Sequence, residues 1–112
     1  MLCAAAVVGL ATACARVAGK VNPPRWWAAA HWALGMSALV VLAYASLAMG
    51  VPRLANWALV VLFASGAGGV VIHLCYDAKD APVVLCTVHT FLGLTGFCML
   101  SVAVFWPSVG MR

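Results

Sequence analysis

Long apolar runs separated by short polar segments make up almost the whole chain. The runs cover residues 2–18, 26–49, 57–76 and 83–106. A helix that crosses a bilayer needs about 20 mostly apolar residues, which three runs reach and the first approaches. The short connections predict antiparallel neighbours. The pattern therefore predicts an all-α protein, a four-helix up-down transmembrane bundle that forms a single domain over residues 1–112.

The first run has an alternative interpretation as a secretory signal peptide. It is short, and it ends with the small residues Ala13-Cys14-Ala15, which are typical of a cleavage site. It lacks the basic start that such peptides carry, so we interpret residues 2–18 as a membrane helix.

Composition supports lipid as the solvent. The chain is 67% hydrophobic and 7% charged, against about 45–50% and about 25% in soluble domains. The net charge of +4 comes mostly from the connections, so no nucleic-acid patch is expected. Basic residues favour the first and third connections over the second, which predicts that residues 19–25 and 77–82 face the cytoplasm or the matrix. Membrane lipids are the predicted surroundings.

One segment of the chain occurs twice. Ala30–Leu42 (AHWALGMSALVVL) and Val88–Leu100 (VHTFLGLTGFCML) agree in register at four positions, among them a His followed four residues later by a Gly. Residues four apart share a helix face, so His31 stacks over Gly35, and His89 over Gly93. A histidine above a missing side chain is suited to a flat ligand held against the helix.

All three histidines are expected at one end of the bundle. His31 and His89 lie at similar depth on parallel helices, and His73 approaches the same face from the opposite direction. Ionisable groups inside a membrane are costly and point to function. Two imidazoles at matched depth predict a bis-axial site for haem iron, with Arg25, Lys20 or Lys79 as the partner for the propionates. The alternative is that these histidines only bond to neighbouring helices or headgroups.

The residues that flank the third connection offer an alternative metal site to the haem. His73, Cys75, Cys86 and His89 would offer imidazole and thiolate ligands for copper(I) or zinc. The stripe of Ser65, Gly69 and His73 predicts instead a close helix contact. The chain has no Glu, and its two Asp side chains lie in one connection, so no independent catalytic site is visible.

Both histidine segments resemble the cytochrome b-561 type of transmembrane domain. RWWAAAHWALG, residues 25–35, is similar to that family's segment in which a basic and aromatic start precedes a ligating His. VHTFLGL, residues 88–94, is similar to an LHSWLGL-like ligand segment. The resemblance implies haem b between His31 and His89. The family usually has six helices and two haems, and this chain offers histidines for one.

A further resemblance is to the membrane anchor subunits of succinate dehydrogenase. Residues 31–35 (HWALG) are similar to an HRxTG segment of those subunits, and residues 73–77 (HLCYD) to an HLxxD segment. In this chain Trp32 stands at the position of the Arg in the HRxTG segment. Gly66 stands at the position where the anchor subunits have their haem-ligating His.

These observations together predict a small subunit of a redox complex in an energy-transducing membrane: mitochondrial inner, thylakoid or bacterial plasma membrane. Haem b would carry electrons to or from a quinone or a partner subunit. The alternative is a cofactor-free accessory subunit of a respiratory or photosynthetic complex that offers only packing and lipid-facing surfaces. Lipid and quinone are further candidate ligands.

Overall fold

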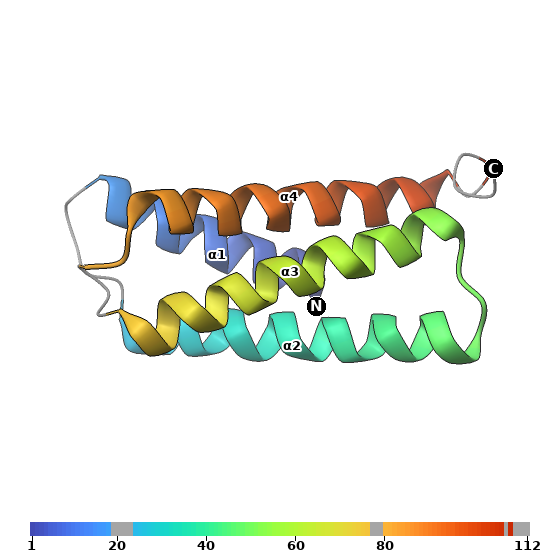
Figure 1. The fold of residues 1–112 in the computed structure, drawn as a ribbon, viewed down its shortest axis with the longest axis horizontal. Helices are drawn as coiled ribbons and strands as arrows, with labels where there is room; N and C mark the ends of the chain where they lie inside the picture. The colour runs from blue at the N-terminus through green and yellow to red at the C-terminus, as the bar shows by residue number, and fades with distance from the viewer. Residues whose placement is uncertain (19–23, 77–79, 107, 109–112) are drawn as a thin grey trace.

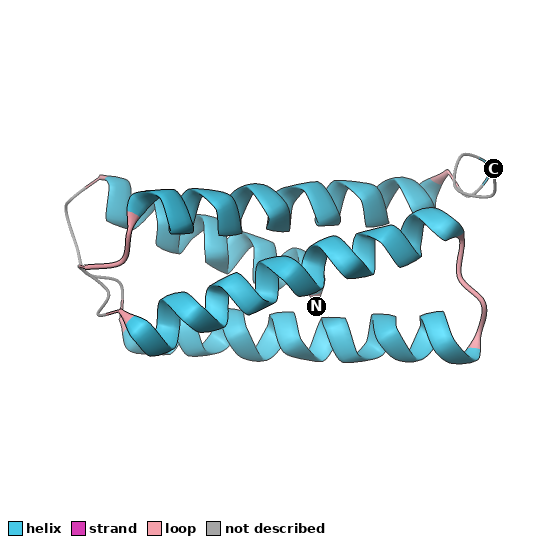
Figure 2. Ribbon diagram, viewed as in Figure 1, coloured by secondary structure: helices cyan, strands magenta, loops and turns pink. Residues whose placement is uncertain are grey.

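The structure is a computed structural model that describes residues 1–18, 24–76, 80–106 and 108. These residues form α-helices and no strand (Figures 1 and 2): α1 (Leu2–Val17), α2 (Arg25–Ala48), α3 (Arg53–Cys75) and α4 (Val83–Phe105). The helices lie side by side in a rod of 44 × 22 × 21 Å. The predicted all-α four-helix bundle is therefore confirmed.

Two helical hairpins compose the bundle. The closest helix pairs are α3 with α4 and α1 with α2, while α2 with α3 and α1 with α4 are in lighter contact. The four helices thus form a ring in which α2 and α4 face each other diagonally. α1 lies behind α3 in Figure 1, and the N-terminus lies near the middle of the rod's length.

Proline precedes three of the four helices. Pro24, Pro52 and Pro82 occupy the N-cap positions of α2, α3 and α4, with φ of −53°, −53° and −57°. The predicted start of the third helix at Trp57 is wrong, because α3 begins at Arg53. The apolar run marks where side chains enter lipid, whereas the helix begins directly after the proline that cannot continue a preceding one.

A tight turn joins the two hairpins. Gly50 follows the C-cap of α2 with φ of +68°, the left-handed conformation that glycine adopts without steric cost. The Ser46 hydroxyl donates to the side-chain oxygen of Asn56 across this turn. The turn therefore has a side-chain bond between α2 and α3.

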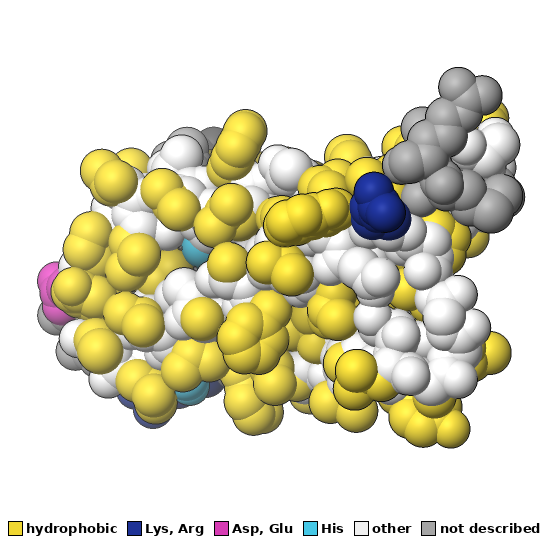
Figure 3. All heavy atoms as spheres, turned by 45° about the vertical axis from the view of Figure 1, so that its right-hand side comes forward, with side chains coloured by type: hydrophobic (Ala, Val, Ile, Leu, Met, Phe, Trp, Pro, Cys, Tyr) yellow, Lys and Arg dark blue, Asp and Glu magenta, His cyan; other side chains and the backbone are white. Residues whose placement is uncertain are grey.

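The outer surface is apolar and the core is small. The buried apolar residues are almost all alanines, with Leu62 as the largest, while side chains such as Leu47 (90% exposed) and Val83 (80%) point outward. Figure 3 shows hydrophobic atoms over most of one face, with the charged groups near its two ends. Removing large apolar side chains from water is strongly favourable, so this surface is suited to contact with lipid.

Three of the helices have the length that a membrane-spanning helix needs. α2, α3 and α4 have 24, 23 and 23 residues and are long and apolar enough to cross a bilayer. α1 has 16 residues, which rise about 24 Å against a hydrocarbon core of about 30 Å. Trp26 is exposed at one end of the rod, and Trp57 and Trp106 at the other, as in the aromatic belts of membrane proteins.

Candidate functional site

Each helix contributes one residue to a layer across the bundle. His31 and His89 lie six residues after the first residues of α2 and α4, Gly69 six residues before the last residue of α3, and Gly9 eight residues before that of α1. At a rise of 1.5 Å per residue these positions are about 9–12 Å from the same end of the rod. Histidine and glycine therefore alternate around the ring of helices at one depth.

The two histidine rings meet across the diagonal of the bundle. The ring centroids of His31 and His89 are 6.1 Å apart, and the ring planes make an angle of 84°. Both side chains are half-buried. The structure thus brings together two histidines that are separated by almost sixty positions in the sequence.

Hydrogen bonds to the backbone define the tautomer of each ring. His31 donates from Nδ1 to the Ala5 carbonyl oxygen at 2.7 Å, and His89 donates from Nδ1 to the Ser65 carbonyl oxygen at 2.8 Å. A carbonyl can only accept, so Nδ1 carries the proton and Nε2 of the neutral ring has the lone pair. This is the arrangement in which metal-ligating histidines are usually held.

Glycines on the neighbouring helices make room for the rings. A Cβ on Gly9 would lie 2.7 Å from Cε1 of His31, and a Cβ on Gly69 would lie 2.9 Å from Cε1 of His89. Real Cβ atoms essentially never come this close to another atom, so any side chain at either position would displace a ring. Each histidine therefore requires a glycine on the helix beside it.

The site consists of two copies of one arrangement. In each hairpin the histidine bonds to a carbonyl on the preceding helix, and the glycine beside the ring follows that carbonyl residue by four positions: Ala5 and Gly9 in α1, Ser65 and Gly69 in α3. The sequence repeat in α2 and α4 therefore has a counterpart in α1 and α3. Only Leu2, Ala4 and Gly9 recur there as Leu62, Ala64 and Gly69, so few identical residues mark that second repeat.

Gly35 and Gly93, the glycines predicted beside the histidines, have different surroundings. A Cβ on Gly35 would meet no atom within 4 Å, whereas one on Gly93 would lie 3.2 Å from the Ser65 hydroxyl oxygen. Ser65 is only 5% exposed, and its hydroxyl donates to the His89 carbonyl oxygen at 2.9 Å. Gly35 therefore faces open space, while Gly93 lets a hydroxyl approach the backbone of α4.

His73 and Arg25, the remaining predicted site residues, lie outside this layer. His73 is exposed on α3, one helical turn from Gly69 toward the end of the helix. Arg25 is exposed at the first residue of α2. Two further basic residues near this end, Lys20 and Lys79, lie outside the described residues. Arg25 is thus exposed at the same end of the bundle as the histidine layer.

The alternative metal site around the third connection is not formed. Within residues 1–18, 24–76, 80–106 and 108, no three or more His, Cys, Asp or Glu side chains gather closely enough to hold a metal ion. The physical reason is orientation, because His89 turns inward toward Ser65 while His73 and Cys75 are exposed on α3. The prediction that His73, Cys75, Cys86 and His89 form a site is wrong.

Sequence reasoning missed half of the layer. Ser65 and Gly69 were expected in a helix contact, but their partner, His89, was not identified, and neither was the contact of Ala5 and Gly9 with His31. The available signal was the shared spacing of a small residue and a glycine four positions later in both odd-numbered helices. In small-residue helices such spacings are frequent, so they do not by themselves indicate a ligand site.

Comparison with known proteins gives no relative. No family model, no curated protein and no solved structure matches this chain. The fold and the site define a class of protein. It is a small all-α membrane protein in which two histidines face each other inside the helix bundle.

Proposed function

We propose that the chain is a membrane subunit of a redox complex that binds one b-type haem between His31 and His89. The observation that carries the proposal is the paired imidazoles, 6.1 Å apart at their centroids with both Nδ1 groups bonded to backbone carbonyls. Two imidazoles that bind one metal ion from opposite sides, with bonds of about 2.0–2.1 Å, have centroids about 6–6.5 Å apart. The separation fits that geometry.

The surrounding residues also fit a haem. Both Nε2 atoms have the lone pair that iron requires, and Gly35 leaves space beside His31. Arg25 offers a cation for a propionate about 9 Å along α2 from His31. When bound, haem would supply a one-electron redox centre. The chain's own residues would supply the two ligands and fix their tautomers.

A partner is part of the proposal. The described surface is apolar along the rod, and the chain has few loop residues that could form a soluble substrate site. We therefore propose exchange of electrons with a quinone or with a neighbouring membrane subunit of an energy-transducing membrane. The end that carries Arg25 is proposed to face the cytoplasm or the matrix.

The test is an optical spectrum of the protein purified from haem-replete cells in mild detergent. The proposal expects b-type bands in the reduced-minus-oxidised spectrum and about one haem per chain. The bands should be lost in His31→Ala and in His89→Ala. They should persist in His73→Ala, a matched control because His73 is exposed and outside the layer.

Folding is checked in the same samples by circular dichroism and gel filtration. A folded wild-type protein that takes up no haem overturns the proposal and favours a cofactor-free accessory subunit. A chlorophyll or another pigment bound at the same histidines would appear in the same spectrum and would also overturn it.

A further inference from the structure

One hydroxyl group distinguishes the two halves of the histidine site. The carbonyl that accepts from His31 belongs to Ala5, and the carbonyl that accepts from His89 belongs to Ser65. Ala5 and Ser65 occupy equivalent places, four residues before Gly9 and Gly69, and both are buried, with 4% and 5% exposure. The serine hydroxyl is therefore an addition to an otherwise repeated arrangement.

Ser65 contacts His89 at both the ring and the backbone. Its hydroxyl donates to the His89 carbonyl oxygen at 2.9 Å, and the same oxygen lies 3.3 Å from Nδ1 of the His89 ring. Together with the Ser65 carbonyl at 2.8 Å, two oxygens surround the Nδ1 proton. The absence of a side chain on Gly93 permits this approach, because a Cβ there would lie 3.2 Å from the hydroxyl oxygen.

Helix packing also differs between the two halves, and it too favours a firmer hold on His89. A Cβ on Gly96 of α4 would lie 2.6 Å from Cγ of Leu62, so α3 and α4 are in close contact two helical turns along α4 from His89. α2, which carries His31, has no fully buried residue within its described length. Both the ring and the helix of His89 are therefore more tightly held than those of His31.

We infer that Ser65 is a positioning residue that makes His89 the firmly held ligand and His31 the exchangeable one. This inference rests on the proposed haem. If haem is bound, His89 would remain its ligand, and an external ligand such as carbon monoxide would take the place of His31. One electron-pair donor would replace another, so the exchange would need no oxidant or reductant.

The first part of the experiment uses the haem-free protein. Nitrogen NMR of ¹⁵N-histidine-labelled protein in detergent micelles measures the tautomer and the N–H exchange rate of each ring. We expect the slower exchange for His89. Ser65→Ala should speed exchange at His89 by about two- to tenfold, the range that one hydrogen bond represents, and leave His31 unchanged. Ser37→Ala is the control, because Ser37 bonds only to the Ala33 carbonyl of its own helix.

The second part uses the haem-loaded protein. We expect His31→Gly to lose the bands of the bis-histidine haem but to retain most of its haem through His89 and to bind carbon monoxide when reduced. We expect His89→Gly to lose most of its haem. Carbon monoxide should bind reduced wild type about tenfold more tightly than reduced Ala5→Ser, in which a second hydroxyl holds His31. Ser65→Ala should shift the reduction potential, which the Ser37→Ala control should not.

The two parts separate the possible failures. A wild-type protein without haem overturns the proposed function, and the NMR exchange rates then still decide whether Ser65 restrains His89. Equal exchange rates at both rings, or an unchanged rate in Ser65→Ala, overturn the inference even if haem binds. Retention of haem by His89→Gly with loss from His31→Gly overturns it as well.

Discussion

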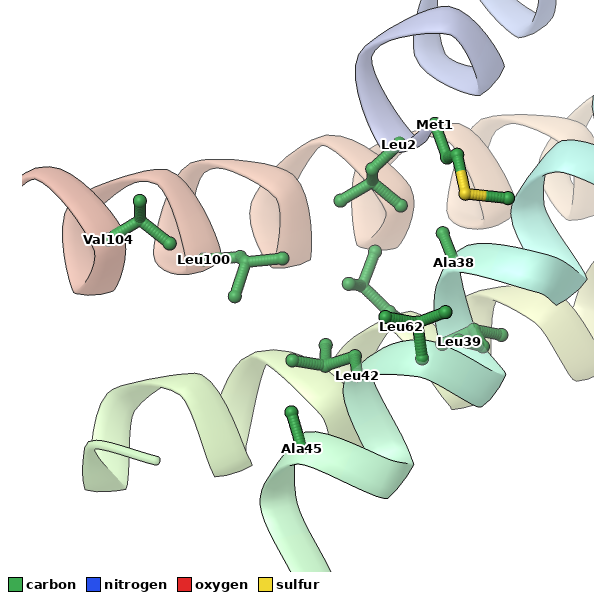
Figure 4. A pocket seen from close by; sticks show the side chains of 10 residues that line it. Met1, Leu2, Ala38, Leu39, Leu42, Ala45, Leu62, Leu100 and Val104 are labelled. Carbon is green, nitrogen blue, oxygen red and sulfur yellow. The ribbon is translucent and has the colours of Figure 1, made fainter. Parts of the chain in front are cut away.

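Each of the hairpins α1–α2 and α3–α4 carries one half-site, that is, a histidine together with the carbonyl and the glycine of the neighbouring helix. The two hairpins differ in how closely their helices pack. In the second hairpin, Leu62 lies so close to Gly96 that a Cβ there would approach its side chain to 2.6 Å and its backbone nitrogen to 3.2 Å. The equivalent positions of the first hairpin, Leu2 and Ala38, line a cavity of about 370 Å³ (Figure 4). Matching registers therefore give a close helix contact in the second hairpin, whereas the equivalent residues of the first hairpin border a cavity that Leu62, Leu100 and Val104 of the second hairpin also line.

The two hairpins also differ in the described length of their first helix. α1 has 16 residues and α3 has 23, and α1 begins near the middle of the bundle (Figure 1). The cavity lies beside its first residues, and all the residues that line it are apolar: Met1, Leu2, Ala38, Leu39, Val41, Leu42, Ala45, Leu62, Leu100 and Val104. Ala5 and Gly9, which contact His31, lie in the first half of α1. The first hairpin thus forms its part of the histidine site directly beside the cavity.

The largest predicted effect tests whether both half-sites matter. Gly9→Ala and Gly69→Ala place a Cβ at 2.7 Å and 2.9 Å from a histidine ring. The ring must shift away from its carbonyl partner, and losing such a supporting bond costs about 10–100-fold in metal affinity. We expect a haem affinity lowered by that factor in each variant, measured by haem titration followed by absorbance.

A matched control exists on the second hairpin. A Cβ on Gly68 would lie 4.0 Å from Cβ of His89, so Gly68→Ala should keep its haem affinity. If Gly9→Ala binds haem as wild type does while Gly69→Ala fails, the first hairpin does not hold a ligand.

The tight contact of the second hairpin gives the next effect. Gly96→Ala adds a methyl group against the side chain and backbone of Leu62, and overpacking of this kind costs about 1–3 kcal/mol. Thermal unfolding in detergent should show a lower Tm. Gly66→Ala is the control, since its Cβ would meet only the end of the Leu39 side chain at 3.4 Å. A Tm for Gly96→Ala at or above that of wild type would contradict the close packing of α3 and α4.

The sequence predicts the helices of this bundle better than its contacts. Apolar runs and prolines determine where each helix lies, because lipid requires every backbone group to be bonded within the helix. The start of α3 was missed, because Arg53 and Asn56 are polar although they belong to its first turn. Side-chain polarity and backbone helicity are different properties, and they diverge at the membrane surface.

The site was predictable only in part for a similar reason. His31 and His89 stand out because a histidine is rare and costly in an apolar helix. Gly9 and Ala5 do not stand out, because small residues are common in membrane helices, whatever they contact. Which helix faces which histidine depends on the rotation of each helix about its axis, and weakly patterned apolar sequences leave that rotation undetermined.

A smaller effect on the Tm is predicted from filling the cavity beside the first residues of α1. Ala45 lines the cavity, so Ala45→Leu adds apolar atoms where none are packed, and cavity filling commonly contributes about 0.5–2 kcal/mol. We expect a higher Tm in detergent with an unchanged haem spectrum. Ala48→Leu, at the exposed end of α2, is the control and should leave the Tm unchanged. A lower Tm for Ala45→Leu would mean that the cavity is already occupied in the membrane.

The smallest effect concerns the bond that joins the hairpins. The Ser46 hydroxyl donates to the Asn56 side chain across the α2–α3 turn, and because both residues are near the surface, its loss should cost about 0.5–1.5 kcal/mol. Ser46→Ala should lower the Tm slightly, and Ser37→Ala, which removes a bond within α2 only, should lower it less.

A double-mutant cycle separates this bond from the side chains themselves. If the bond is the cause, Ser46→Ala combined with Asn56→Ala should cost no more than the larger of the two single variants. Additive losses would show that the two side chains stabilise their own helices independently. Haem affinity should be unchanged in all three variants, because the histidine layer lies at the opposite end of α2 and is held within each hairpin rather than by the turn between them.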